Sequence, residues 1–454
     1  MNGQDVLKNA IELINEYKFK EINHSIIDEV CGSNNIFKNE LYSNSKKILH
    51  FVWIGIPDEK ALLYLSVWAH HYPNYEVNLW IDSKYLYANI FKDKIEDIRK
   101  NKKLIELLKT QELLYDEYQK LRLKDNPLEQ IIDKFFQQDF SKGIDKLKII
   151  NELVSKFNFL NIKDIREYKS IIPKEIEIYY EKEIILRSNL AAASDISRLC
   201  ILKKFGGVYL DIDTLPCLEY VFKNSKVYEN FEFYYNELID IYKSQLYLEK
   251  YTKELNPNLA IENYNIKVEL ITGDNIKKEK IVEYLESLKH DIKSHDIKKV
   301  EALPFIIRKN LLMIGTSKVK LNTFYNNVLV SEKNGKMVSI ILKEICKRYK
   351  YISSKNYDRW ESVEKYNKIY KNSYLDRLVG YRLDALADIP NTTVILTGPC
   401  MILEVYLSLT YNIFKLDKNI DPRKIASLYQ SSNFGITCRN LMTFTLENSK
   451  STWM

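Results

Sequence analysis

The 454-residue sequence contains only 12 glycines and 10 prolines, which excludes long flexible or proline-rich linkers. Its six cysteines are widely spaced and form no CxxC pair, so neither a zinc ribbon nor a compact disulfide framework is expected. No run approaches the roughly 18 apolar residues of a membrane span. The N-terminus lacks the apolar core of a secretory signal peptide. We therefore expect a compact, soluble protein that does not use the Sec route.

Charge of either sign is nearly balanced, because 68 Lys and Arg against 61 Asp and Glu give a net charge of +7. This excess is too small for a chain of this length to indicate a nucleic-acid partner. The motifs GxSxG, GxxxxGK(S/T) and GxGxxG are absent, which removes the usual signals of α/β-hydrolases, P-loop proteins and dinucleotide-binding proteins. His70 and His71 lack HExxH spacing and a third ligand, so no zinc site is expected there.

The length fits either two domains or one α/β core with large insertions. Residues 1–46 have helix-like apolar spacing and predict a small N-terminal helical region. The run ILHFVWIG from residue 48 predicts a buried parallel strand, followed by a helix at 58–71 and a strand at 75–82. This order is typical of an α/β fold, which we assign to residues 47–454.

Two lysine-rich stretches interrupt the α/β pattern. Residues 84–182 and 218–300 have helical periodicity and predict helical insertions. Strand-like runs follow around residues 311–315, 327–330 and 393–396, and Gly398-Pro399 predicts a turn after the last of them. The core is therefore expected to resume after each insertion.

The segment RSNLAAASDISRLCILKKFGG predicts a helix that has Ser188 or Asn189 as its N-cap and ends at Gly206-Gly207. Asp195 and Arg198 are three residues apart on this helix and therefore share a face. A surface ion pair worth under about 1 kcal/mol is the plain alternative. That alternative does not explain why the pair leads directly into a glycine turn and an acidic strand.

The acidic strand is VYLDID, on which Asp211 and Asp213 are expected to point to the same side. Ligands of open α/β sheets collect at the carboxyl ends of strands, where this pair should lie. Two carboxylates favour Mg²⁺ or Mn²⁺, and such an ion could bridge a diphosphate. Asp-x-Asp occurs by chance about once or twice in a chain this long, so its weight comes from the preceding helix.

Three segments together resemble the catalytic glycosyltransferase domain of the large clostridial glucosylating toxins and related bacterial effectors. They are HFVWIG at 50–55, NLAAASDISR at 189–198 and FGGVYLDIDTLP at 205–216, in matching order and approximate spacing. FYNN followed by VLVSEK at 324–333, TGP at 397–399 and the final Ser-x-Trp are also similar. The resemblance covers landmarks from residue 48 to residue 453, whereas the insertions align poorly.

The resemblance implies a GT-A (Rossmann-like) fold and retaining transfer from a UDP-sugar, with Mn²⁺ or Mg²⁺ as the metal. Trp53 would stack on the uracil, and Ser194 would line the same nucleotide pocket. Asn89 and Leu190 are further candidates for that pocket.

For the sugar, the resemblance implies that Asp195 and Arg198 bind hydroxyl groups and that Arg198 also lies near the diphosphate. Tyr209 would support this arrangement, and Asn326 would hydrogen-bond the sugar. The catalytic residues implied by the resemblance are Asp195, Arg198 and Asn326 together with Asp211, Asp213 and Trp453.

For the metal, the resemblance implies direct coordination by Asp213 and contact through water by Asp211, which would also hold ribose and sugar hydroxyls. Ser451 would complete the metal shell, and Trp453 would donate to the glycosidic oxygen of the departing diphosphate.

The sequence departs from the family at one position. The family usually has Glu three residues before the terminal Ser, where this chain has Asn448. Either Glu447 substitutes through a shift of register, or the metal loses an acidic partner and binds more weakly.

The acceptor implied by the resemblance is a Thr or Tyr hydroxyl of a host protein, a Rho/Ras-type small GTPase. The chain would then be a bacterial toxin or effector, secreted or translocated, that acts in the host cytosol at the inner face of the membrane. The N-terminal helices would make weak membrane contact. Tyr325 and Asn327 flank Asn326 and are bulky enough to crowd an N-acetyl group, which favours UDP-glucose over UDP-N-acetylglucosamine.

Three other functions stay open at this point. A bacterial cell-surface or glycan glycosyltransferase would share the ASDxxR and GGxYxDxD pattern. An inactive homologue that serves as a binding module would account for Asn448. A metal phosphohydrolase would need more His or Asp ligands near Asp213, and the sequence shows none.

Overall fold

The computed structural model describes residues 47–124, 127–137, 148–149, 151–152, 155, 160–226, 237–257, 278–317, 321–366, 374–384, 392–430, 436–438 and 442–445. The predicted helical region at residues 1–46 lies outside the described residues. The described residues fall into two units. Unit 1 consists of the described residues within Met1–Ile56, Asn78–Tyr209 and Ile306–Arg439. Unit 2 consists of the described residues within Pro57–Val77, Leu210–Phe305 and Asn440–Met454.

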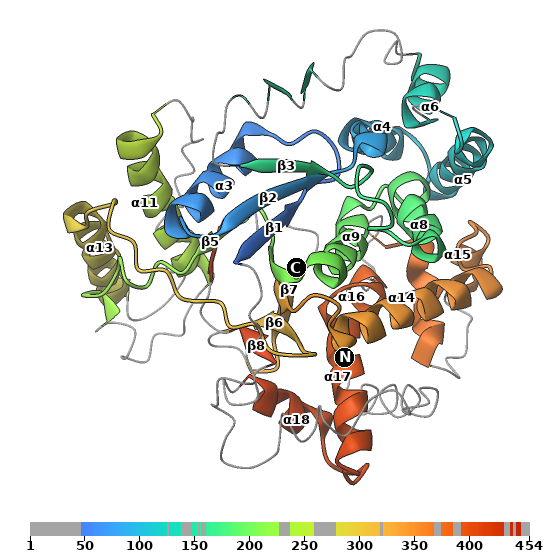
Figure 1. Cartoon of the computed structure of the whole chain (residues 1–454). Coiled ribbons are helices and arrows are strands. Elements are labelled where there is room, and N and C mark those ends of the chain that lie inside the picture. Colours follow the sequence, from blue (N-terminus) through green and yellow to red (C-terminus); the bar gives the residue numbers. More distant parts are fainter. Residues whose placement is uncertain are drawn as a thin grey trace. The chain divides into compact units, whose positions relative to one another are not determined.

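Unit 1 is built on a seven-stranded sheet with the strand order β3-β2-β1-β4-β7-β6-β8 (Figure 1). Its strands are β1 (Ile48–Val52), β2 (Glu76–Ile81), β3 (Asn161–Asp164), β4 (Gly207–Leu210), β6 (Leu312–Thr316), β7 (Phe324–Ser331) and β8 (Thr437–Cys438). The pairs β1–β4, β2–β3 and β6–β8 are parallel, whereas β6–β7 is antiparallel. All five residues of β1 are buried, as expected of a strand inside a parallel sheet. The predicted α/β class is confirmed.

Helices pack around this sheet, and α9 contacts both β1 and β7. The α-helices of unit 1 are α4 (Ala88–Asn101), α5 (Leu104–Leu121), α6 (Pro127–Phe136), α8 (Lys174–Glu181), α9 (Leu190–Phe205), α14 (Lys336–Ser354), α15 (Ser362–Lys365), α16 (Thr392–Leu396), α17 (Pro399–Ile413) and α18 (Pro422–Tyr429). Shorter helical segments are η3 (Ser83–Tyr85), η4 (Lys182–Leu186) and η5 (Tyr374–Arg382).

Unit 2 contains α3 (Glu59–His71), α11 (Glu237–Leu255), α13 (Lys278–Ser294) and a two-stranded antiparallel sheet of β5 (Thr214–Pro216) and β9 (Met442–Phe444). The side chain of Asp58 caps α3 by accepting a hydrogen bond of 2.7 Å from the backbone nitrogen of Ala61. Helix α3 packs against β5, and α11 packs against α13 and β9.

Helix α9 begins and ends at the residues that the sequence indicated. Asn189 is its N-cap, and Oδ1 of Asn189 accepts a hydrogen bond of 3.0 Å from the backbone nitrogen of Ala192. The helix ends at Gly206, whose φ of +68° is a left-handed value that favours glycine. Because the indole of Trp80 can only donate, Nδ1 of His50 accepts from it at 2.9 Å, and Nε2 of His50 donates to the carbonyl of Gly206 at 2.8 Å.

Three local predictions are wrong. Residues 393–396 form helix α16 instead of a strand. The predicted insertion at 84–182 is not helical throughout, because Asn161–Asp164 form the polar edge strand β3. Asp211 and Asp213 are not on a strand, because β4 ends at Leu210 and the carbonyl of Asp211 closes a turn with Thr214.

One stretch, Thr392–Ile413, is long and apolar enough to cross a membrane by length and composition, with 22 residues and a mean hydropathy of 1.5. It is not an unbroken run of apolar residues, because Thr397, Gly398 and Glu404 lie within it. In addition, 67% of its apolar window is buried inside the protein, and Glu404 within it forms ion pairs with Arg348 and Arg377. A core helix has the same profile.

We expect Gly206→Ala to lower the free energy of unfolding by about 2–4 kcal/mol, measured by urea denaturation. A left-handed φ costs a non-glycine residue about 1 kcal/mol, and the added Cβ would overlap the backbone nitrogen of Lys333. Lys204→Ala in the same helical turn is the control and should change the unfolding free energy by less than about 1 kcal/mol. Equal stability of Gly206→Ala and the unaltered protein would contradict this role of Gly206.

Candidate active site

The carboxylate of Asp195 lies in the middle of α9 and is 0% exposed. Its Oδ1 accepts a hydrogen bond of 2.8 Å from Nδ2 of Asn326 and lies 2.9 Å from the guanidinium of Arg198. Its Oδ2 accepts a hydrogen bond of 2.7 Å from the hydroxyl of Thr397. One buried carboxylate thus joins α9, β7 and the residues between α16 and α17.

Arg198 carries the opposite charge and contacts the same group of residues. It donates to the carbonyl oxygen of Asn326 at 2.9 Å and to the hydroxyl of Ser194 at 3.3 Å. Its guanidinium carbon lies 4.4 Å from the centre of the Tyr209 ring, a cation–π distance. Since the Arg198 side chain is only 4% exposed, Asp195 and Arg198 are not a surface ion pair.

Asn326 reaches Asp195 from an irregular part of β7. Tyr325 pairs with Gly315 of β6, but the next pair is Leu329 with Ile314, so the residues between them bulge out of the ladder. Bulges redirect side chains and often lie beside active sites. Here the amide of Asn326 is directed to Asp195, whereas Oδ1 of Asn327 lies against Gly315 and would be 2.7 Å from a Cβ placed there.

A second buried network supports Thr397. The carboxylate of Asp384 accepts hydrogen bonds from the backbone nitrogen of Thr393 at 2.7 Å and from the guanidinium of Arg187 at 2.5 Å. Asn189, which caps α9, donates to the Thr393 hydroxyl at 2.7 Å. The carbonyl of Thr393 in turn accepts from the backbone nitrogen of Thr397 at 3.0 Å. The start of α9 and the residues around α16 are therefore fixed together.

The charges of this network are balanced despite their burial. Arg187 is paired with Glu183 at 2.6 Å as well as with Asp384. Burial alone would lower the pKa of Arg187, but the two carboxylates hold that pKa above its ordinary value. Burial raises the pKa of Glu183, although Arg187 and the hydroxyls of Tyr349 and Tyr381 oppose this shift.

Helix α14 contributes another group of buried charges, which contacts α16 and α17. Arg348 bonds Glu344 at 2.7 Å and Glu404 at 3.0 Å, and it also donates to the carbonyl of Ile395. Burial would raise the pKa of Glu404, but Arg377 and Arg348 outweigh it and hold that pKa below its ordinary value. The segment that carries Thr397 is thus held on this side too.

Within unit 2, Asp211 and Asp213 are partly exposed and stand in the turn between β4 and β5. The carbonyl of Asp211 accepts hydrogen bonds from Thr214, 2.7 Å from its hydroxyl and 3.3 Å from its backbone nitrogen. The carbonyl of Asp213 accepts from the hydroxyl of Thr445, and the carbonyl of Thr214 accepts from the Trp68 indole at 2.9 Å. The backbone of the acidic turn is therefore anchored to α3 and to the residue after β9.

The acidic turn fits part of a metal site. Mg²⁺ and Mn²⁺ are commonly bound by one or two carboxylates together with water and substrate phosphates, and Asp211 and Asp213 supply two such groups. Over the part of the chain that the structure describes, no group of three or more His, Cys, Asp or Glu side chains could hold a metal ion. The predicted third ligand, Ser451, lies outside the described residues.

The candidates for the nucleotide pocket are in unit 1. Trp53 is half-buried directly after β1, and its backbone nitrogen donates to the carbonyl of Trp80 at 2.9 Å. Oδ1 of Asn89 accepts from the backbone nitrogen of Ile56 at 3.4 Å, so Asn89 contacts the loop that follows Trp53. Leu190 is the first residue of α9 and packs against the core.

The remaining predicted residues cannot be placed. Trp453, Glu447 and Asn448, like Ser451, lie outside the described residues, so the departure from the family at position 448 stays a prediction about metal binding.

Thr397 was missed as a site residue by sequence reasoning, as were Arg187 and Asp384. The TGP turn at 397–399 was a signal for Thr397, since it resembles a family turn, but nothing in the sequence tied its hydroxyl to Asp195, which is 202 positions away. Arg187 stands two residues before the N-cap Asn189, and nothing in the sequence tied its side chain to Asp384, which is 197 positions away.

Comparison with known proteins places these observations in a family. The family model of the TcdA/TcdB catalytic glycosyltransferase domain matches residues 47–372. The chain is 25% identical to Toxin B of Clostridioides difficile over 96% of this chain and 19% of that protein. It is 27% identical to Toxin A of Clostridium novyi over 84% of this chain and 19% of that protein. The chain thus spans about a fifth of the length of these relatives.

Solved structures show the same fold. The catalytic domain of alpha-toxin from Clostridium novyi matches with a TM-score of 0.68 at 20% identity, over 100% of this chain and 90% of that chain. The UDP-bound glycosyltransferase domain from the YGT toxin matches with a TM-score of 0.56 at 17% identity, over 89% and 82%. The predicted GT-A fold is confirmed. Because the family model covers more than half of the 454 residues, the chain belongs to the family of TcdA/TcdB catalytic glycosyltransferase domains.

Proposed function

We propose that this chain transfers a sugar from a UDP-sugar, with retention of configuration, to a Thr or Tyr hydroxyl of a host small GTPase. The observation that carries the proposal is the buried cluster of Asp195, Arg198, Asn326 and Thr397 inside a chain of this family. The glycosyltransferase domain of the YGT toxin was solved with UDP bound, which supports a UDP-linked donor here. The relatives are toxins, which supports action of this chain in the host cytosol.

In the proposed reaction, the bond between the anomeric carbon and the diphosphate breaks. A bond from the anomeric carbon to the acceptor oxygen forms on the same face of the sugar, and the hydroxyl proton leaves with UDP. Asp195 and Asn326 hold sugar hydroxyls, and Arg198 stabilises negative charge on the diphosphate. Their mutual hydrogen bonds fix these groups before the donor binds, so little reorganisation is needed during the reaction.

Asp211, Asp213 and Ser451 would hold Mn²⁺ or Mg²⁺, which when bound would neutralise charge that develops on the departing diphosphate. The partial exposure of both aspartates in an anchored turn supports this role. Trp53 would stack on the uracil, with Asn89, Leu190 and Ser194 around the nucleotide, and Trp453 would donate to the glycosidic oxygen. Tyr209 would hold Arg198 in place through its ring.

UDP-glucose is the proposed donor, but only one of the two residues that flank Asn326 would crowd an N-acetyl group. Since Oδ1 of Asn327 lies against Gly315, crowding of an N-acetyl group would come from Tyr325 on the other side of Asn326.

The main test measures transfer of label from UDP-[¹⁴C]glucose, with Mn²⁺, to proteins of a host-cell lysate. We expect a labelled band of small-GTPase size, and loss of that band with Asp211→Asn/Asp213→Asn. Hydrolysis of the donor without an acceptor should fall at least about 100-fold in the same variant, because both proposed metal ligands are weakened. Label on lipid or glycan alone would reject the host-protein acceptor, and unchanged hydrolysis in the double variant would reject the metal role.

Thr397 is expected to act as a positioning residue through Asp195. Thr397→Val keeps the shape but removes the donor to a buried carboxylate, which costs about 1–3 kcal/mol. We expect kcat for UDP-glucose hydrolysis to fall roughly 10- to 100-fold, with a smaller change in KM. Thr397→Ser keeps the hydroxyl and should restore most of the activity.

Thr437→Val is the matched control for Thr397→Val. It removes the buried hydroxyl of Thr437, which donates to the carbonyl of Tyr429 at 2.8 Å on the distant edge strand β8. It should lower stability but leave kcat unchanged. If both valine variants lose the same activity, or if serine does not restore it, Thr397 has only a structural role.

Donor choice is tested by Tyr325→Ala. We expect the ratio of UDP-N-acetylglucosamine to UDP-glucose hydrolysis to rise about tenfold or more, since one steric conflict in a pocket is worth about 1–3 kcal/mol. The neighbouring Asn327→Ala, whose side chain faces β6, should leave the ratio nearly unchanged. A larger effect from Asn327 than from Tyr325 would overturn this assignment.

A further inference from the structure

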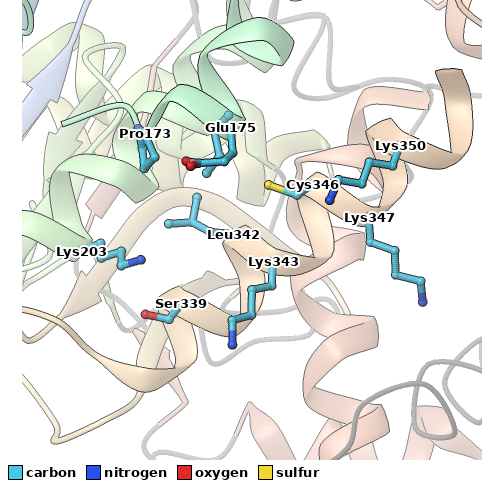
Figure 2. A pocket seen from close by; sticks show the side chains of 10 residues that line it. Pro173, Glu175, Lys203, Ser339, Leu342, Lys343, Cys346, Lys347 and Lys350 are labelled. Atoms are coloured by element: carbon cyan, nitrogen blue, oxygen red, sulfur yellow. The ribbon is translucent and has the colours of Figure 1, made fainter. Parts of the chain in front are cut away.

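A cavity of about 550 Å³ opens on unit 1 where α8, the last turn of α9 and one face of α14 meet. Its lining is Pro173, Glu175, Ile176, Lys203, Ser339, Leu342, Lys343, Cys346, Lys347 and Lys350, which we call the lysine groove (Figure 2). None of these residues belongs to the proposed donor site. Lys203 lies in the last turn of α9, whereas Asp195 and Arg198 lie in its middle.

The charge of the lysine groove is strongly one-sided. Four lysines and one carboxylate, that of Glu175, line the cavity. Lys347 also lies 3.9 Å from the carboxylate of Glu344 on its own helix, so the groove keeps an excess of two formal positive charges when Glu344 is counted. Figure 2 shows Lys203 and Lys350 at opposite ends of the row of α14 residues, with Glu175 across from that row. The buried side chains of Ile176 and Leu342 form an apolar floor. Ammonium groups brought together in this way repel each other, and a multivalent anion would relieve that repulsion.

The positions of the lysines on α14 follow from the geometry of a helix. The three α14 lysines of the groove, Lys343, Lys347 and Lys350, follow one another at intervals of four and three residues, which places them on a single helix face. The opposite face of α14 buries Arg348 against Glu344 and Glu404, so the helix cannot rotate to disperse the lysines. Lys347 is further steadied by its hydrogen bond of 2.6 Å to the hydroxyl of Tyr374.

Cys346 lines the groove between charges of both signs. Burial raises the pKa of the Cys346 thiol; the charges of Lys350 and Lys203 lower this pKa, whereas the charge of Glu175 raises it. Lysines from two helices, Lys350 on α14 and Lys203 on α9, therefore act on a side chain that lines the cavity.

We propose that the lysine groove binds a compact anion with two or more phosphate groups, at a site separate from the donor site. The volume lies within the range of about 300–1,000 Å³ typical of small-molecule sites. Lysine recognises phosphate as a point charge without needing planar geometry, which suits a row of ammonium groups. The ligand could be a soluble polyphosphate or the phosphorylated headgroup of a lipid, which share this chemistry.

The test is calorimetric titration of inorganic tripolyphosphate into the Asp211→Asn/Asp213→Asn protein in EDTA, so that metal-assisted binding to the donor site does not contribute. We expect one site per chain and a loss of at least about tenfold in affinity, or 1.4 kcal/mol, when Lys203→Gln/Lys350→Gln is added. The matched control, Lys418→Gln/Lys424→Gln, removes the same charge from exposed positions outside the groove and should not alter the affinity. Thermal unfolding of each variant checks that the fold is kept.

A vesicle arm separates the two sources of phosphate. Flotation with phosphatidylcholine vesicles containing 10% phosphatidylinositol 4-phosphate, lost only in the groove variant, would assign the groove to a lipid headgroup. Binding of tripolyphosphate without flotation would assign it to a soluble ligand. The proposal is overturned if neither probe binds, if the groove variant binds as well as its parent, or if the control loses as much affinity as the groove variant.

Discussion

The structure of the candidate site depends on how the buried carboxylate of Asp195 is compensated. An ionised group removed from water is tolerated only when it is paired and hydrogen-bonded, because its desolvation costs several kcal/mol. Asp195 meets this demand with three partners, namely Arg198 on the same helix and Asn326 and Thr397 from distant parts of the chain. The bulge in β7 and the break between α16 and α17 carry two of these partners, Asn326 and Thr397.

Other buried charges of unit 1 are compensated in the same way. Two further ion pairs are also buried, Arg187–Asp384 and Arg348–Glu404. The first links the N-cap of α9 to the segment that carries Thr397, and the second links the buried face of α14 to the same segment. Buried ion pairs contribute little net stability, but removing one partner is costly, so they favour a single arrangement. Helix α14 shows both uses of charge, since its buried face is paired whereas its lysine face lines an open cavity.

Much of this arrangement could be predicted from sequence because it is encoded locally. The spacing of Asp195 and Arg198, the cap at Asn189 and the glycine end at Gly206 all lie within one helix. The partners could not be predicted, because Thr397 and Asp384 are about 200 positions away and helix periodicity carries no information about them. Two local errors have the same origin. The β-branched run at 392–396 favours a strand, but tertiary packing makes it helical, and a hydrogen-bonded turn interrupts the acidic strand at Asp211.

Recognition of the donor sugar by the Asp195 cluster can be separated experimentally from binding of the nucleotide. The most direct measurement compares the affinities of UDP and UDP-glucose, in Mn²⁺, for the unaltered protein and for Asp195→Asn. If the cluster recognises the sugar, Asp195→Asn binds UDP as well as the unaltered protein does but loses the additional affinity that the glucose provides. Equal weakening of both ligands, or no change in either, would contradict sugar recognition by Asp195.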